Sequence, residues 1–274
     1  MSKLLRANFT RLWKSKIFWI GMAFMFGLSL YISILSKPID CIDENLFMGG
    51  TYIPVVAGAF IGLFIGTEYK DGTIRNKLIV GQTRYAVYFS NFIVCISALL
   101  MMHFTYIIVV FGIGLPLVGN LQQTLETIIT LILISIVTLI ALCGIFMFIS
   151  MMIHSKSNGS VSAIMFSIFL LVSALIIYSG LQEPEYYDSY TLSYMDESGQ
   201  NHEEFNEKMK NPNYLEGRKR KIYEFLYDFL PGCQMFQIAS QDLPHPERLP
   251  LYSLGIFVVT TTCGIIFFRK KDLK

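Results

Sequence analysis

The sequence predicts an all-α polytopic membrane protein with six transmembrane helices and both termini in the cytoplasm. Hydrophobic residues make up 53% of the 274-residue chain and charged residues only 15%, and the charges avoid long apolar blocks. Basic residues gather in alternate connections between these blocks. A soluble chain would spread its charges along every amphipathic element, so these two observations place the chain in the membrane class.

Six apolar segments are long enough to cross ~30 Å of hydrocarbon, which takes about 20 helical residues. They are roughly 17–35, 50–66, 88–114, 125–152, 160–180 and 251–268. The third and fourth should tilt or extend beyond the bilayer. No small-residue cleavage site follows the first, so we expect an uncleaved anchor. The even number puts both termini on one side of a single transmembrane domain, 1–274.

The charge distribution selects that side. The N-terminal arm, the connection after span two, the loop after span four and the C-terminal tail together carry fourteen basic and three acidic residues. The first opposite-side loop has Asp40, Asp43 and Glu44 against Lys37 alone. Short loops follow the positive-inside rule, so the termini and the 67–84 connection are expected in the cytoplasm.

The N-terminal arm, 1–16, is expected to contain an amphipathic elbow helix. One face is apolar and the opposite face is cationic: Leu5, Phe9, Leu12 and Trp13 against Lys3, Arg11 and Lys14. Such a helix rests in the lipid headgroup layer with its cations on anionic lipid.

Span two carries Gly58, Gly62 and Gly66 at four-residue spacing. This leaves one helix face without side chains, so that another backbone can approach closely. The pattern fits packing within the chain, which we favour, or a subunit interface.

The segment 181–250 is expected outside the cell. A helix at about 219–230 has its apolar residues at helical spacing, and Pro231-Gly232 should end it. These residues are Ile222, Phe225, Leu226, Phe229 and Leu230. We expect the helix to lie flat against the outer leaflet or the span tops, either as a lid over the exit or as a static cap. The candidate gate residues are Ile222, Phe225, Leu226, Phe229 and Pro231. We expect the basic run 218–221 to be the solvent-exposed flank of this helix. We expect the segment 183–213 to form a small irregular cap.

The connection 67–84 has the chemistry of a short capped helix. Gly72 breaks from span two, Thr73 can act as N-cap, and Gly81 suits the left-handed position past a helix end. The enclosed helix, about 74–80, is roughly 10 Å long at 1.5 Å per residue. Ile74 and Leu78 form its apolar edge, and Arg75 and Lys77 its cationic edge.

Glu68 stands at the end of span two. A charge in the bilayer centre costs at least ~2.5–3.5 kcal/mol, so this carboxylate should sit at the interface and be paired. Arg75, Arg84 and the free amides of the short helix are the candidate partners. The pair either braces the loop or takes part in signalling through it.

The pattern E-Y-x-x-G-T-I-R-N-K-L-I-V-G-x-T-R, Glu68 to Arg84, resembles the coupling segment of type-2 ABC exporter permeases. Phe229-Leu230-Pro231-Gly232-Cys233-Gln234 is similar to that family's turn before its re-entrant outer helices. The resemblance implies a permease subunit in the plasma membrane of a bacterium, exporting a hydrophobic or amphipathic peptide, antibiotic or lipid-like compound. It implies that Glu68, together with Gly72, Thr73, Ile74, Arg75, Asn76, Lys77 and Leu78, couples to a cytoplasmic ATPase dimer. The second permease copy would be identical or homologous.

The chain has no G-x-x-x-x-G-K-[ST] motif, so ATP and Mg are expected on the partner ATPase and no cofactor on this chain. A membrane-embedded enzyme would need a motif such as H-E-x-x-H or G-x-S-x-G, which the sequence lacks. A sensor or immunity protein that never transports would have no evident use for the coupling segment. The basic residues line the membrane, which gives no support to nucleic-acid binding.

Isolated polar residues complete the candidates. His103, near the middle of span three beside Thr105, suggests an interhelical hydrogen bond or a substrate path, and we favour the hydrogen bond. No cysteine spacing suits a metal site, and a Cys41–Cys233 disulfide is left open.

Overall fold

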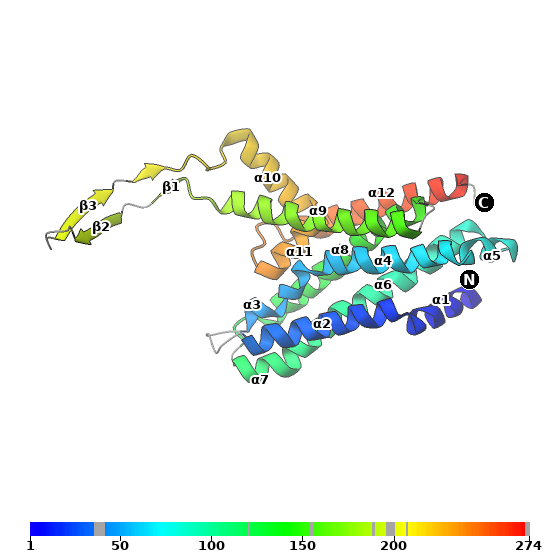
Figure 1. Cartoon of the computed structure of the whole chain (residues 1–274). Coiled ribbons are helices and arrows are strands. Elements are labelled where there is room, and N and C mark those ends of the chain that lie inside the picture. Colours follow the sequence, from blue (N-terminus) through cyan, green and yellow to red (C-terminus); the bar gives the residue numbers. More distant parts are fainter. Residues whose placement is uncertain are drawn as a thin grey trace.

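The computed structural model describes residues 1–35, 42–119, 121–153, 156–187, 190–195, 201–206 and 208–271. Within these ranges, six helices are long and apolar enough to cross a membrane. They are α2 (Lys16–Leu35), α4 (Ile53–Lys70), α6 (Arg84–Val109), α8 (Leu125–Met152), α9 (Lys156–Gln182) and α12 (Arg248–Lys270). They run side by side in an elongated bundle with both termini at one end (Figure 1). The prediction of six spans is confirmed.

The third span is longer than its α-helix. It continues beyond Val109 through a π-helical turn, Val110–Gly114, into the short helix α7 (Leu115–Val118). A π turn inserts an extra residue into the helical repeat and so redirects the side chains that follow it. The extension reaches the end of the bundle opposite the termini (Figure 1).

Helices α4 and α9 pack closely at the centre of the molecule. A Cβ added at Gly58 would lie 2.7 Å from the Cβ of Ser167, and one at Gly62 would lie 3.0 Å from the Cβ of Ala163. Both contacts are within the chain. Gly66 is buried on the same helix. The missing side chains therefore let α9 approach the α4 backbone directly.

The opposite end of the bundle is built from short helices. Asp43–Leu46 (α3) and the 3₁₀ turn Met48–Thr51 (η1) precede α4, and Gly217–Phe229 (α10) and Pro231–Ser240 (α11) precede α12. The prediction that Pro231-Gly232 ends the outer helix is confirmed, because α10 ends at Phe229 and Leu230 is extended. Pro231 then occupies the first turn of a new helix, α11, where a helix needs no N–H donor. Nearly all of α11 is buried, including Gln234 and Gln237.

Gln234 fixes α11 inside the bundle. Its Nε2 donates to the carbonyls of Asp228 (2.8 Å) and Leu249 (3.3 Å), and its Oε1 accepts from the hydroxyls of Thr138 (3.1 Å) and Ser253 (2.5 Å). This one amide joins α8, α10, α11 and α12. A buried amide must satisfy its donors and acceptors, and this one does so only at the junction of these helices.

Helix α10 packs between the outer parts of α9 and α12 (Figure 1). The rings of Phe225 and Phe229 stack 5.4 Å apart, and both meet Tyr252 of α12 edge-on. The predicted apolar arc is only partly covered by the span tops, because Ile222 and Phe225 are about half exposed. Instead, Tyr227 and Asp228 are buried. Of the basic run, Arg218, Lys219 and Lys221 are exposed, whereas Arg220 turns towards Glu224.

The expectation of an irregular cap at 183–213 is wrong. Two antiparallel strand pairs form a hairpin that projects away from the bundle (Figure 1). Strands β1 (Tyr186–Tyr187) and β4 (Met209–Lys210) form its base, and β2 (Tyr190–Met195) and β3 (Asn201–Asn206) its outer part. Alternating aromatic and polar residues suit strands, a pattern that the low aliphatic content of this segment obscured.

Cys233 is a free, buried thiol. Cys41 lies outside the described residues.

Candidate functional site

The connection between α4 and α6 folds as a short helix, α5 (Thr73–Ile79). Gly72 precedes it in the left-handed conformation (φ 63°) and occupies the N-cap position predicted for Thr73. Gly81 follows it with φ 90°, as expected from its position past the helix end. Both conformations are costly for residues with a side chain, which explains the two glycines. The Thr83 hydroxyl then accepts from the Ala86 amide (3.2 Å) and starts α6.

Helix α5 turns its apolar edge inwards. Ile74 is 1% exposed and Leu78 packs against the main hydrophobic core. The residues left in solvent are Arg75, Asn76, Ile79 and Val80, the last two 71% and 79% exposed. Ile74 is therefore unable to contact a partner protein in this conformation. The exposed surface of α5 carries Arg75, Asn76, Ile79 and Val80 instead, so it is rotated by one residue from the face predicted from the sequence.

Glu68 is the centre of a buried polar cluster. The residue is 1% exposed, and its carboxylate forms ion pairs with Arg11 and Lys77 and accepts a hydrogen bond from the Asn91 amide. The prediction that this carboxylate is paired is confirmed. The predicted partners Arg75 and Arg84 are wrong, because Arg75 points into solvent and Arg84 binds elsewhere.

Asn8 completes the cluster from the N-terminal helix α1 (Ser2–Lys14). Its Nδ2 donates to Ser90 Oγ (3.0 Å) and Asn91 Oδ1 (2.7 Å) of α6. Its Oδ1 accepts from Lys77 Nζ (2.8 Å) of α5. We call Asn8, Arg11, Glu68, Lys77 and Asn91 the Glu68 cluster. It connects α1, α4, α5 and α6 through polar contacts at the termini end of the bundle.

Arg11 does not lie on a solvent-facing cationic edge, as the helical wheel of α1 predicted. Its guanidinium stacks on the Phe64 ring, 3.9 Å from the centroid, while Nη1 contacts the carboxylate. None of its buried nitrogens makes a well-directed hydrogen bond, so the contact with Glu68 is ionic rather than a two-pronged fork. Leu4, Asn8 and Leu12 form the buried face of α1. The need to pair a buried carboxylate determines the direction of Arg11.

The cluster carries two cations for one carboxylate. Burial lowers the pKa of Lys77, and the neighbouring Glu68 carboxylate opposes that shift. Each charge depends on the others, because a buried charge that loses its partner costs several kcal/mol. Movement of α5 would therefore disturb α1, α4 and α6 together.

A second set of polar contacts lies on the other side of α4. The Tyr69 hydroxyl donates to the Met151 carbonyl at the end of α8 (2.8 Å). Lys271 Nζ donates to that same carbonyl (2.6 Å) and to the Tyr69 hydroxyl (3.0 Å). Arg84 Nη1 donates to the Phe268 carbonyl (2.6 Å), which closes the last turn of α12. Burial lowers the pKa of Lys271 to about 8.

Adjacent residues of α4, Glu68 and Tyr69, therefore hold two sides of the bundle at its termini end. Asn8, Asn91 and Lys271 were not predicted from the sequence. The available signal was Asn91, a strongly polar residue in an apolar span, which requires a partner there.

His103 lies deep in the bundle, 1% exposed, with Nε2 3.0 Å from the Ser135 hydroxyl of α8. This contact is an interhelical hydrogen bond. Thr105 donates to its own helix at the Met101 carbonyl (2.7 Å). The structure does not bring these two side chains together with the Glu68 cluster.

Comparison with known proteins adds the family. A family model described as ABC-2 family transporter protein matches residues 4–174. The chain belongs to the ABC-2 transporter family. The matched region of this ABC-2 chain includes every member of the Glu68 cluster, whereas α10, α11 and α12 follow it. A comparison with curated proteins found no match. Membership points to a transport subunit and implies partnership with an ABC ATPase. Together with the six apolar helices, it indicates a multi-pass membrane protein.

Proposed function

We propose that this chain is the permease subunit of an ATP-driven exporter in a bacterial plasma membrane. A pair of permeases, identical or homologous, would work with a separate cytoplasmic ATPase dimer that binds ATP and Mg. The cargo would be a hydrophobic or amphipathic compound such as a peptide, an antibiotic or a lipid, because the spans carry hydroxyls but few charges.

The Glu68 cluster carries the proposal. Glu68, Lys77 and Arg11 join α5 to α4 and α1 through buried ion pairs. Separating these charges would cost free energy, because each would be left buried without its partner. A push on α5 would therefore move the membrane helices instead of bending the loop. The exposed Ile79 and Val80 give a partner protein an apolar contact at the tip of this helix.

Association with the ATPase through α5 is testable by co-purification. The double substitution Ile79→Asp and Val80→Asp should reduce recovery of the ATPase with the permease by about tenfold, since it places two charges in an apolar contact. Arg6→Asp, an exposed position on α1, is the control and should leave recovery unchanged. Full recovery with the double variant would exclude α5 as the docking element, and ATP hydrolysis by the lone subunit would refute the proposal.

We further propose that α10 is a gate over the exit, rather than a static cap. Its aromatic contacts with Tyr252 would part when α12 moves. Cysteines at Phe229 and Tyr252, joined by a short cross-linker in a background without reactive native thiols, should block export reversibly. Phe225→Ser with Phe229→Ser should raise ATP turnover without export. Undiminished export by the cross-linked protein would make α10 a passive cap.

A further inference from the structure

The base of the projecting hairpin is fixed by one buried amide. Asn211 is 2% exposed and directly follows β4. Its N–H donates to the Glu185 carbonyl (3.0 Å), and its Nδ2 donates to the Glu183 carboxylate (2.7 Å) and the Pro184 carbonyl (3.0 Å). Its Oδ1 accepts from the Tyr187 hydroxyl (3.0 Å). The hairpin therefore leaves the end of α9 from a base whose hydrogen bonds are satisfied, in a defined direction.

The outer part of this hairpin lies beyond the end of the bundle (Figure 1). Among the described residues, β2 pairs with β3 and with no other strand. A two-stranded hairpin is marginally stable in water, and its edges keep unpaired N–H and C=O groups. From Tyr186 to Met195 the chain can extend at most about 30 Å, at ~3.3 Å per residue. That reach spans roughly three helix spacings of about 8–10 Å, which is enough to meet a neighbouring bundle.

The charge of the hairpin selects a cationic partner. The segment 183–207 contains eight acidic residues and no Lys or Arg. Two of the acidic residues, Glu203 and Glu204, are adjacent on β3. An excess of one sign attracts surfaces of the opposite sign and repels those of its own.

Unpaired cations of this kind stand at the start of α10. Arg218, Lys219 and Lys221 are exposed, and none of them forms an ion pair with another described residue. The outer strands of the same chain do not cover them, because β2 and β3 point away from α10 (Figure 1). The chain therefore carries an acidic surface and a basic surface at one end without bringing them together.

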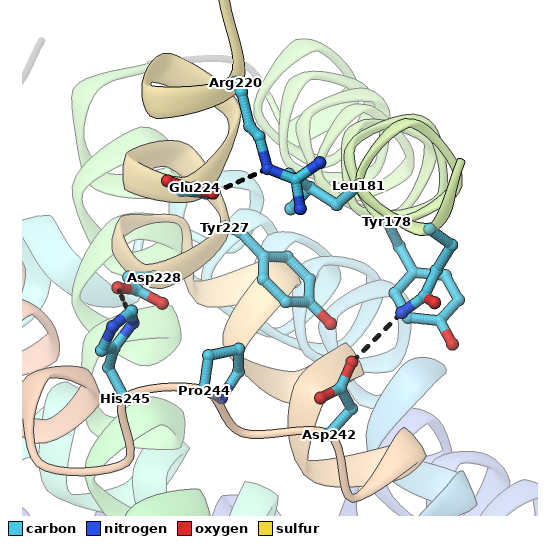
Figure 2. Close-up of a pocket in the computed structure, with 10 residues that line it drawn as sticks. Tyr178, Leu181, Arg220, Glu224, Tyr227, Asp228, Asp242, Pro244 and His245 are labelled. Atoms are coloured by element: carbon cyan, nitrogen blue, oxygen red, sulfur yellow. Dashed lines mark hydrogen bonds and ion pairs between the residues drawn. The ribbon is translucent and has the colours of Figure 1, made fainter. Parts of the chain in front are cut away.

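The other charges around α10 are already paired. A cavity of about 250 Å³ lies between α9, α10 and the segment that joins α11 to α12. In its wall, Arg220 pairs with Glu224 (3.1 Å), and Asp228 pairs with His245 (3.2 Å) (Figure 2). These charges satisfy one another within the chain, so the other three cations of α10 are the ones left for a partner.

We propose that the acidic hairpin of one copy docks across the start of α10 in a second copy of this chain, whose own hairpin docks in return. The inference rests on the proposed pairing of two permeases. A reciprocal contact is the form expected of a two-fold pair. A second copy is favoured over a cationic cargo, because both complementary surfaces belong to this chain and lie at the same end of it (Figure 1). Each hairpin would then restrain the α10 helix of its partner.

The test uses the full chain in membranes that contain two differently tagged copies without reactive native thiols. One copy carries Glu204→Cys in the hairpin and the other carries Lys219→Cys on α10. A short cross-linker should join the two tags. Leu125→Cys in place of Lys219→Cys is the matched control, because Leu125 is exposed at the same end of the bundle, and it should give no more than about a tenth of that yield.

Charge reversal tests the attraction itself. Arg218→Glu with Lys221→Glu in the second copy should lower the cross-linking yield about tenfold, since like charges then face each other. Adding Glu203→Lys to the hairpin of the first copy should recover part of the yield. High salt should lower the yield of the parent pair, because exposed charges are screened. Both reversed positions on α10 are exposed, so the variants should melt with the parent.

Co-purification of the two tags without cross-linker reports the pairing separately. Tags that co-purify but give no cross-link between hairpin and α10 would overturn this inference and leave the permease pair standing. Tags that never co-purify would overturn the pairing on which the inference rests. A yield unchanged by charge reversal, cross-links formed only within one copy, or a cationic peptide that replaces the second copy at Glu204→Cys would each overturn the inference.

Discussion

At the scale of single residues, the decisive feature is a carboxylate that the fold surrounds with cations. Glu68 has Arg11 and Lys77 as ionic partners and Asn91 as a hydrogen-bond donor. Lys77 in turn binds Asn8. The side chain of Lys77 is only 11% exposed, so water cannot replace Glu68. The carboxylate therefore determines both the stability of this end and the position of α5.

Glu68→Gln should lower the free energy of unfolding by roughly 2–3 kcal/mol, because it leaves two cations without a counter-charge. The cost stays below that of a fully buried pair because the Arg11 side chain is 25% exposed. Adding Lys77→Gln should recover at least half of the loss, since the second buried charge is removed as well. Apparent melting temperatures in detergent provide the measurement.

The same variants distinguish coupling from bracing. If the cluster transmits movement, the double variant regains stability while substrate-stimulated ATPase activity of the assembled complex stays low. Activity that recovers together with stability would show that the pair only braces the loop. Glu68→Ala should likewise lose coupling before it loses the folded state, and a variant that is simply degraded would count against this role.

Lys271 makes stability depend on pH in the alkaline range. Its pKa is about 8 in the folded chain against an ordinary 10.5, so the unfolded chain binds more protons between these values. Stability from this group therefore rises as pH increases from about 8 to 10.5. Lys271→Met should lose that rise, measured as the melting temperature at pH 8 and pH 10. The exposed neighbour variant Lys270→Met should keep it, and equal pH profiles for all three proteins would contradict the assignment.

At the scale of elements, α4 and α9 pack closely because the glycines of α4 have no side chains to keep α9 away. The Cβ of Gly58→Ala would lie 2.7 Å from the Ser167 Cβ and 2.8 Å from the Ala163 carbonyl oxygen, so α9 must shift. We expect a loss of about 1–3 kcal/mol, as for other overpacked sites. Gly255→Ala on α12 is the matched control, because no atom lies within 4 Å of its added Cβ.

Gly255→Ala should therefore be neutral or slightly stabilising, since alanine favours helix over glycine by about 1 kcal/mol. Thermal unfolding of the two variants in the same detergent compares them directly. Equal melting temperatures would mean that α4 and α9 are not tightly packed at Gly58.

Helices α10 and α11 act differently at the other end. Gln234 binds α11 to α8, α10 and α12. Helix α10 is held by polar contacts only at Tyr227 and Asp228, and elsewhere by aromatic contacts that leave Ile222 and Phe225 half exposed. Apolar contacts are not directional and can slide, while a satisfied buried amide has one geometry. Of the two helices, α10 therefore has the larger share of contacts that can slide, while its last turn stays bound to α11 through the Tyr227 and Asp228 carbonyls.

At the scale of the whole molecule, polar clusters concentrate at the two ends of an apolar bundle. The Glu68 cluster and the contacts of Tyr69, Arg84 and Lys271 hold the termini end. The cavity beside α10 and the projecting hairpin lie at the other end (Figure 1). The proposed exporter function would need this separation, because force would enter at one face of the membrane and cargo would leave at the other.

The sequence by itself determined the six spans, the shared end of both termini and the short helix α5 with its flanking glycines. These features depend on local properties: the length of apolar runs and the backbone conformations available to Gly72 and Gly81. Family membership could also be recognised from the Glu68–Arg84 pattern. Such features require no knowledge of which helices become neighbours.

Only the tertiary structure decided which cation pairs with Glu68 and which face of α5 is buried. Several basic residues lie near Glu68 in the sequence, yet one of its partners, Arg11, comes from the N-terminal helix α1. Asn8 and Asn91 likewise meet across 83 positions of the chain. A buried charge is satisfied by whichever groups the helix packing brings within reach, and that packing is a property of the whole bundle rather than of any local stretch.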